Sequence, residues 1–171
     1  GDGPLIRAQT LKTLCTSDAP LTVLTAELFD PRGYGRVVRD GLGQVRAIVE
    51  DKDCSAEQRT ITTVNTGILA ADARRLRVWV HNLDDRNTHG ELYLTDVFAQ
   101  AAAESVPAMP LECRSERETL GANDPGQLAR LERVLQSRQA QALCMQGLRL
   151  ADPARFDLRG ELSWARDVEI G

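Results

Sequence analysis

Short apolar and β-branched runs alternate with stretches of helical period along most of the chain. The runs that predict strands are residues 20–27, 36–40, 44–50, 61–70 and 106–113. The stretches that predict helices are residues 8–15, 72–83 and 95–104. This alternation is typical of an α/β layered fold, and it predicts a mainly parallel sheet.

The second half of the chain ends in a different pattern. Asp124-Pro125 is a helix-start signal, and a helix is expected to run from there to Gly147. Its apolar stripe consists of Leu128, Leu131, Leu135, Ala142 and Met145. The turn-rich text after this helix predicts a linker and a short strand. The expected divisions are therefore residues 1–125, a connecting helix at 126–150, and a linker at 151–171.

Size and charge exclude several classes of function. With 171 residues, 42% hydrophobic and 27% charged, the chain has the size and composition of one globular domain. Its net charge of -4, without long runs of one sign, disfavours nucleic acid or an anionic membrane as partner. No apolar stretch approaches the ~20 residues that span a bilayer. A small or polar substrate fits better.

The cysteines indicate a reduced compartment. Cys15, Cys54, Cys113 and Cys144 form no CxxC pair, and the two histidines, at positions 81 and 89, do not complete the usual spacing of a zinc site. We interpret all four as free thiols, and the protein as cytoplasmic.

Glycines and hydrogen-bonding side chains cluster where predicted strands end. The clusters are Gly33-Tyr34-Gly35-Arg36, Val49-Glu50-Asp51-Lys52-Asp53 and Val64-Asn65-Thr66-Gly67-Ile68. Ligands of open α/β sheets bind at the carboxyl ends of strands, and this arrangement suits a sugar nucleotide. The residues alone equally allow Gly35 to be a turn glycine, Glu50 a solvated strand end and Asn65 a cap of its own loop.

Seven segments spread over the chain resemble one known family in order and spacing. They are GDGPLI, DPRGYGRVVRD, AIVEDKDCSAEQR, VNTGILAAD, GELYLTD, GANDPGQLARLER and DPARFDLRG. The family is the bifunctional N-acetylglucosamine-1-phosphate uridyltransferase / glucosamine-1-phosphate acetyltransferase. The resemblance implies a Rossmann-like nucleotidyltransferase layered sheet, and a chain that corresponds to the C-terminal part of the uridyltransferase domain.

The resemblance also implies a reaction. The phosphate of N-acetylglucosamine 1-phosphate attacks the α-phosphorus of UTP, giving UDP-N-acetylglucosamine, a precursor of peptidoglycan and lipopolysaccharide, and pyrophosphate. Magnesium is the implied cofactor, since a hard cation neutralises charge on phosphates. The family's triphosphate-binding loop and its acetyl-transferring β-helix find no counterpart. We therefore expect little activity from this chain alone, no acetyl transfer, and a monomer or non-specific oligomer in place of the family's trimer.

The implied magnesium ligands are Asp2, through its carboxylate, and Asn123, through its amide oxygen, with Asn123 also counted among the substrate-binding residues. Read without the family, Asp2 is an exposed terminal acid, and Asn123 is a turn residue before the Asp124 cap. No residue is implied to act as a covalent catalyst.

The implied sugar contacts come from the strand-end clusters and from GELYLTD. Gly35 would offer its backbone N–H, Glu50 would accept from sugar hydroxyls, and Asn65 would hold the acetamido-bearing ring. Tyr93 and Thr95 would line the pocket, although Tyr93 could be core and Thr95 a helix cap. The cations Arg36 and Lys52 could help to bind phosphate, but long cations at a strand end are more often solvated, and neither is counted among the binding residues.

Four positions depart from the family pattern: Gly3 in place of valine, Thr63 in place of glutamate, His89 in place of glutamine, and Ala122. The departure at Thr63 removes a carboxylate beside the expected sugar site. Two alternatives to the uridyltransferase remain at this point. One is a related sugar-1-phosphate nucleotidyltransferase, and the other is a non-catalytic sugar-nucleotide-binding module.

Overall fold

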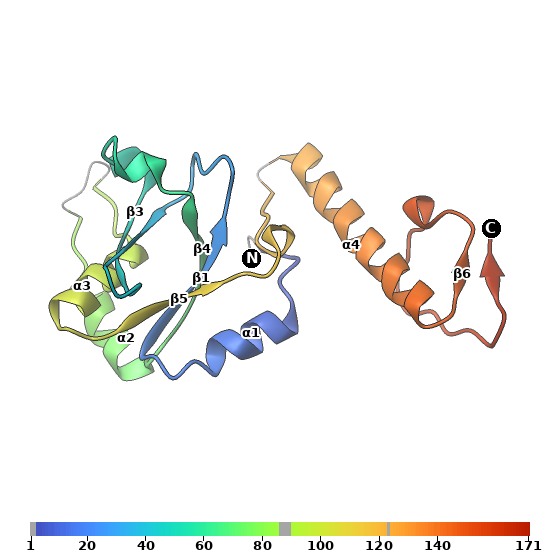
Figure 1. Ribbon diagram of the computed structural model, residues 1–171, viewed down its shortest axis with the longest axis horizontal. Helices are drawn as coiled ribbons and strands as arrows, with labels where there is room; N and C mark the ends of the chain where they lie inside the picture. Colours follow the sequence, from blue (N-terminus) through green and yellow to red (C-terminus); the bar gives the residue numbers. More distant parts are fainter. Residues whose placement is uncertain (1–2, 86–89, 123) are drawn as a thin grey trace. The chain divides into compact units, whose positions relative to one another are not determined.

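The computed structural model describes residues 3–85, 90–122 and 124–171 of the chain (Figure 1). It divides into two compact units. The sheet unit is Ile6–Thr119, and the helix unit is Leu120–Gly171 together with Gly1–Leu5. No helix in the described part of the chain is long and apolar enough to cross a membrane.

The sheet unit is built on five strands in the order β3-β2-β4-β1-β5 (Figure 1). Their bounds are Leu21–Glu27 for β1, Arg36–Arg39 for β2, Val45–Val49 for β3, Thr63–Ala71 for β4 and Ala108–Glu112 for β5. The predicted strands are thus confirmed in position, and the mixed α/β architecture is confirmed with them. β1 is buried over its first six residues because it lies between β4 and β5.

The prediction of a mainly parallel sheet was wrong. Among the described residues β1 and β5 pair in parallel, whereas β1 with β4, β2 with β3 and β2 with β4 are antiparallel. The β2–β3 connection is a tight turn in which Asp40 accepts from the N–H groups of Leu42 and Gln44, both at 2.9 Å. Gly43 supplies the positive φ of +79° that this turn requires. A connection this short forces its strands to be antiparallel.

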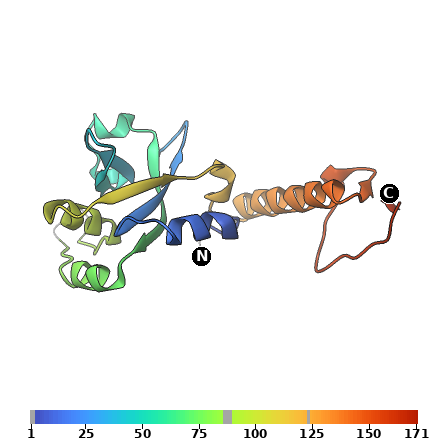
Figure 2. The same ribbon diagram turned by 60° about the horizontal axis from the view of Figure 1, so that its bottom comes forward.

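Helices cover both faces of this sheet. They are α1 (Ala8–Cys15), α2 (Ala73–His81) and α3 (Val97–Ala103). Trp79 of α2 and Phe98 of α3 pack with Leu21 and Val23 of β1 in the larger core cluster. Leu14 of α1 packs with Leu24 in the smaller one. Because successive side chains of a strand point to opposite faces, these two clusters lie on opposite sides of β1; Figure 2 shows α2 and α3 next to each other and α1 apart from them.

Two details of the helix predictions were wrong. The sequence predicts an apolar face of Leu76, Trp79, Val80 and Leu83 for α2, but Val80 is 42% exposed whereas Trp79 beside it is buried, so this face is narrower than predicted. Thr95 does not cap α3, which begins at Val97 with Asp96 in the N-cap position and no side-chain cap bond. A short 3-10 helix at Leu94–Asp96 precedes α3, and the Thr95 hydroxyl within it donates to Glu50 instead.

Four further 3-10 helices complete the local structure, at Asp51–Asp53, Gln58–Thr60, Glu116–Glu118 and Pro153–Arg155. The first of them follows Glu50 directly. All four cysteines are free, as predicted.

The helix unit contains α4 (Pro125–Met145), whose N-cap Asp124 accepts from the N–H of Gln127 at 2.8 Å. The expected apolar stripe was wrong in most positions. Of its large members Leu131 is buried, while Leu128, Leu135 and Met145 are exposed.

Polar contacts hold the following segment against α4 instead. Gln136 is buried because its amide bonds the backbone of Leu158 through both groups, at 2.7 and 3.4 Å. Arg133 pairs with Asp157 at 2.8 Å, and Arg159 pairs with Glu132 at 3.1 Å. The chain ends in a two-residue parallel pair of β6 (Arg149–Leu150) and β7 (Glu169–Ile170), so the predicted terminal strand is confirmed only at its end.

Candidate functional site

Four of the residues implied to bind sugar meet in the sheet unit, although each comes from a different segment. The carbonyl of Gly35, just before β2, accepts from the N–H of Asn65 in β4 at 2.8 Å. Glu50, just after β3, accepts from the Thr95 hydroxyl at 3.1 Å. A side-chain carbon built on Gly35 would lie 3.4 Å from Glu50 Oε1. The structure therefore joins Gly35, Glu50, Asn65 and Thr95 into one cluster.

Gly35 is required for close approach rather than for an unusual backbone angle. Gly33 has a φ of +82°, whereas Gly35 does not adopt a positive φ. A Cβ at Gly35 would meet Ile48 Cγ2 at 3.0 Å and both carboxylate oxygens of Glu50 within 3.5 Å. An alanine there would push either the core or the carboxylate out of place.

Glu50 keeps one carboxylate oxygen for a ligand. The side chain is half-buried, and the Thr95 hydroxyl is the one donor in the described part of the chain that bonds to it. Its second oxygen is therefore without a hydrogen-bond partner there. A carboxylate accepts several hydrogen bonds, so Glu50 can take one or two more from sugar hydroxyls.

A cavity of about 230 Å³ opens beside this cluster. Its lining residues are Gly33, Glu50, Asp51, Lys52, Glu91 and Tyr93. Burial, and then the nearby carboxylates of Asp53, Glu91 and Glu50, raise the pKa of Tyr93, so its phenol stays protonated and can donate. Because Asp51 is paired with Arg36, the carboxylates of the lining exceed the nearby cations by one, and this excess favours hydroxyl donors over an anionic group inside the cavity.

Asn65 combines the two roles that the sequence left open. Its Oδ1 accepts from the N–H of Gly67 at 2.9 Å, so the side chain caps its own loop. Gly67 has a φ of +80°, and the register of β4 against β1 shifts at this point, although β4 itself runs without interruption from Thr63 to Ala71. The amide nitrogen of Asn65 has no partner in the described part of the chain and is left to donate to a ligand.

Arg36 is the residue that sequence reasoning placed wrongly. It was expected to be solvated, but it is 1% exposed. Nη2 pairs with Asp51 Oδ1 at 2.8 Å, Nη1 donates to the carbonyl of Tyr34, and Nε is buried without a partner. The N–H of Gly33 and the guanidinium of Arg36 lower the pKa of Asp51. The signal available in the sequence was an acid two residues after the second strand of a hairpin, opposite an arginine that begins the first strand.

Thr63 stands where the resembled family has a glutamate, yet a carboxylate still lies beside it. The hydroxyls of Thr62 and Thr63 both donate to Glu27, the former at 2.8 Å. Glu27 ends β1 and pairs in register with Thr63. The negative charge next to this position is thus supplied from the neighbouring strand.

The residues implied to bind magnesium, Asp2 and Asn123, lie outside the described residues, as does His89. Within the described ranges, no group of three or more His, Cys, Asp and Glu side chains is placed to hold a metal ion.

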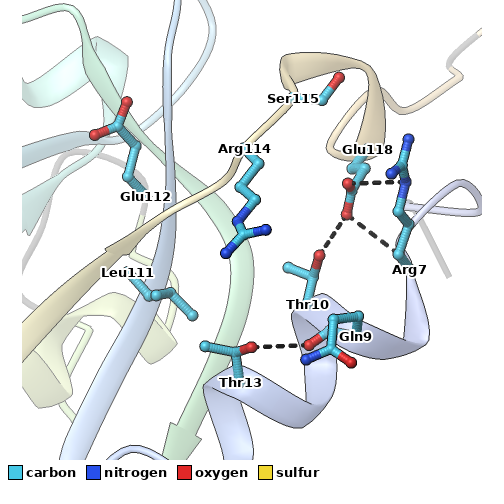
Figure 3. A pocket seen from close by; sticks show the side chains of 9 residues that line it. All are labelled: Arg7, Gln9, Thr10, Thr13, Leu111, Glu112, Arg114, Ser115 and Glu118. Carbon is cyan, nitrogen blue, oxygen red and sulfur yellow. Dashed lines mark hydrogen bonds and ion pairs between the residues drawn. The ribbon is translucent and has the colours of Figure 1, made fainter.

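A second cavity of the sheet unit, of about 400 Å³, lies between α1 and the segment after β5 (Figure 3). Glu118 in its wall is 2% exposed and binds Arg7 and Thr10, so its carboxylate is occupied by the protein itself. Figure 3 shows Arg114 pointing toward α1, and its guanidinium has no partner among the described residues. This cavity shares no lining residue with the one at Glu50.

Comparison with known proteins gives a consistent result at the level of sequence. No protein-family model matches the chain. The protein named bifunctional protein GlmU of Xylella fastidiosa strain 9a5c is 52% identical over 170 residues, which is 99% of this chain and 37% of that protein. The proteins of the same name from Xanthomonas euvesicatoria and Stenotrophomonas maltophilia are 51% and 52% identical, with the same coverage.

Structural comparison adds little. A crystal structure described as a putative glucose-1-phosphate thymidylyltransferase from Bacillus anthracis in complex with a sucrose is 18% identical, with a TM-score of 0.45 over 61% of this chain and 39% of that one. A similarity this low carries no argument about the site. The sequence match is closer: about half of the residues are identical along almost the whole length of the chain, which corresponds to a segment of these bifunctional GlmU proteins and spans 37% of their length.

Proposed function

We propose that this chain carries the sugar-binding half of a uridyltransferase that makes UDP-N-acetylglucosamine and pyrophosphate from UTP and N-acetylglucosamine 1-phosphate. The observation that carries the proposal is the meeting of Gly35, Glu50, Asn65 and Thr95 in one cluster, of which Glu50 also lines an acidic cavity. The 52% identity to GlmU supports the same assignment.

The chemistry of the cavity fits an uncharged sugar ring. Glu50 accepts from ring hydroxyls through its unpartnered oxygen, and the amide nitrogen of Asn65 donates to the acetamido carbonyl. An analogue that leaves either group unpaired would lose about 1–3 kcal/mol of binding free energy, which gives the site its selectivity. The sugar phosphate would point out of the cavity, because Glu50, Asp51 and Glu91 repel a second anion.

The transfer step itself needs little from these side chains beyond position. An in-line attack on the α-phosphorus of UTP is accelerated when the attacking phosphate is held at the correct distance and angle. Binding the ring at two sides, by Glu50 and by Asn65, restricts its rotation and so aims the phosphate. A magnesium ion held by Asp2 and Asn123 would neutralise phosphate charge.

Two measurements test this proposal. Titration calorimetry with UDP-N-acetylglucosamine, and with UDP-glucose as the analogue without the acetamido group, is expected to give saturable heat for the first and at least tenfold weaker binding for the second. Absence of saturable heat at millimolar UDP-N-acetylglucosamine would contradict the sugar site. Equal affinities would contradict the role of Asn65.

Pyrophosphate release from UTP and N-acetylglucosamine 1-phosphate then tests the reaction. The chain alone is compared with the same chain joined to the N-terminal segment of the Xylella fastidiosa relative. We expect release from the joined protein and little or none from the chain alone. Binding without release in either form would indicate a non-catalytic sugar-nucleotide module, and release with dTTP or GTP in place of UTP would indicate a related nucleotidyltransferase.

A further inference from the structure

The ion pair between Arg36 and Asp51 borders the cavity at Glu50, because Asp51 is one of its lining residues. Arg36 begins β2, where it pairs in register with Val49 of β3 and Val64 of β4. Asp51 follows Glu50 in the chain and lines the cavity. The guanidinium is 2% exposed and the carboxylate 26% exposed, so the pair is largely shielded from water.

The same pair also contacts the glycine-rich turn at residues 33–35. Arg36 donates to the carbonyl of Tyr34, and Gly33 lines the same cavity as Asp51, whose pKa is lowered by the Gly33 N–H. The turn is therefore tied to the strand end that carries Glu50 through Arg36, which bonds Tyr34 on one side and Asp51 on the other. The N–H of Tyr34 bonds the carbonyl of Pro31 at 3.2 Å and closes the turn on its other side.

We propose that the Arg36–Asp51 pair is a positioning element that fixes the turn at residues 33–35 relative to Glu50 and thereby sets the geometry of the sugar site. Neither residue needs to touch the ligand for this role. The effect on the turn stands on the contacts alone, and the effect on sugar binding rests on the proposed function.

The energetic reason lies in burial. Removing one partner of a buried ion pair leaves an uncompensated charge in a poorly solvated place, and the surrounding structure rearranges to reach water or another acceptor. The pair contacts the turn through the Tyr34 carbonyl and the strand end that carries Glu50 through Asp51, and the buried Nε of Arg36 already lacks an acceptor. Loss of Asp51 would therefore disturb Glu50 and Gly35 before it disturbs the core.

The same loop offers a matched control. Arg32 and Asp30 form an ion pair with contacts of 2.7 and 2.5 Å, but their side chains are 83% and 51% exposed. An exposed pair of this kind contributes little to stability or to geometry, because water replaces either partner. The two pairs thus differ in burial and in their link to Glu50, but not in chemistry.

The test compares Asp51→Asn with Asp30→Asn in the full chain. Hydrogen exchange is measured at the amides of Gly33 and Tyr34, and at the β1 amide of Val23 as an internal reference. For Asp51→Asn we expect at least tenfold faster exchange at Gly33 and Tyr34 with less than a twofold change at Val23, and for Asp30→Asn no change at any of them. Unchanged exchange in the turn, or an equal rise at Val23, would overturn the positioning role.

Two additional measurements complete the test. Asp51→Glu retains a carboxylate and is expected to restore slow exchange at least in part; if it exchanges as fast as Asp51→Asn, the ion pair is not what holds the turn. In calorimetry, Asp51→Asn should weaken UDP-N-acetylglucosamine binding about tenfold and Asp30→Asn should not. If the unaltered chain fails to bind, the proposed function falls, while the exchange data still decide the role of the pair.

Discussion

Glu118 and Glu50 follow strands of the same sheet, yet the protein uses them differently. Each accepts from a threonine hydroxyl, Glu118 from Thr10 at 2.6 Å and Glu50 from Thr95 at 3.1 Å. Glu118 also binds the backbone N–H of Arg7 at 3.3 Å and the Arg7 guanidinium at 3.1 Å. It is 2% exposed, whereas Glu50 is half-buried beside a cavity.

The difference shows how a carboxylate that stabilises the fold can be distinguished from one that is available to bind a ligand. Helix α1 has no side-chain cap of its own and no acid in its first turn. Glu118 supplies both, because its carboxylate binds the N-cap N–H and lies at the positive end of the helix dipole. The hydrogen bonds and the ion pair of the Glu118 carboxylate thus all go to Arg7 and Thr10, at the start of α1. Glu50 meets no such need, so its remaining acceptor capacity is available.

The largest effect is expected from Glu118→Ala. This change removes the cap of α1 and a charge-assisted hydrogen bond, and it should lower the free energy of unfolding of the sheet unit by about 3 kcal/mol. Urea unfolding followed by the fluorescence of Trp79, in a Trp164→Phe background, measures it. The exposed neighbour Glu116→Ala serves as control and should change stability by less than about 0.5 kcal/mol. A loss below 1 kcal/mol for Glu118→Ala would show that the cap is dispensable.

Glu50→Gln should have the opposite profile. Hydrogen bonds to a charged acceptor contribute about 1.5–3 kcal/mol, so affinity for UDP-N-acetylglucosamine should fall at least tenfold. The free energy of unfolding should stay within about 0.5 kcal/mol, since few protein groups depend on this carboxylate. Calorimetry and urea unfolding are measured on the same samples, with exposed Glu57→Gln as control. A large loss of stability with unchanged affinity would show that Glu50, like Glu118, stabilises the fold and does not bind the ligand.

The comparison also shows where sequence reasoning succeeds. Helix α1 was predicted with its observed bounds, Ala8–Cys15, because the spacing of Leu11 and Leu14 is a local signal. The hairpin at Asp40–Gly43 follows equally from local turn chemistry, and β1 follows from an apolar run. The binding role of Glu50 stays a prediction, which rests on the resemblance to a family because the local pattern of this residue was ambiguous.

The failures involve contacts between segments far apart in the chain. Glu118 lies 111 residues from Arg7, and no spacing rule connects an exposed-looking acid to a distant helix end. Arg36 is buried because Asp51 folds back over it across the β2–β3 hairpin. The direction of β4 relative to β1 also depends on contacts between distant segments, because the apolar pattern of a strand is the same whether it pairs in parallel or antiparallel.

Thr10→Val is expected to have a smaller effect on stability than Glu118→Ala. The change keeps the shape of the side chain but removes the hydroxyl that donates to Glu118, leaving that acceptor with the Arg7 groups. A loss of about 1 kcal/mol in the free energy of unfolding is expected. Thr13→Val is the control in the same helix, because its hydroxyl bonds the carbonyl of Gln9 within α1 at 2.9 Å, and it should be close to neutral. Equal losses of stability in the two variants would show that the hydrogen bond from Thr10 to Glu118 has no specific stabilising effect.

Thr95→Val should produce the smallest effect and separates the two carboxylates most directly. The Thr95 hydroxyl orients Glu50 without being needed for the fold, as α3 begins after it with no side-chain cap. Removing it should weaken UDP-N-acetylglucosamine binding about threefold, the order of one neutral hydrogen bond, and leave unfolding within about 0.5 kcal/mol of the original. Thr60→Val, whose hydroxyl bonds the carbonyl of Glu57 at 2.7 Å, controls for loss of a surface hydroxyl. If Thr95→Val instead lowers stability as much as Thr10→Val does, the Thr95–Glu50 hydrogen bond stabilises the fold. The unpartnered oxygen of Glu50 would then no longer indicate a ligand acceptor.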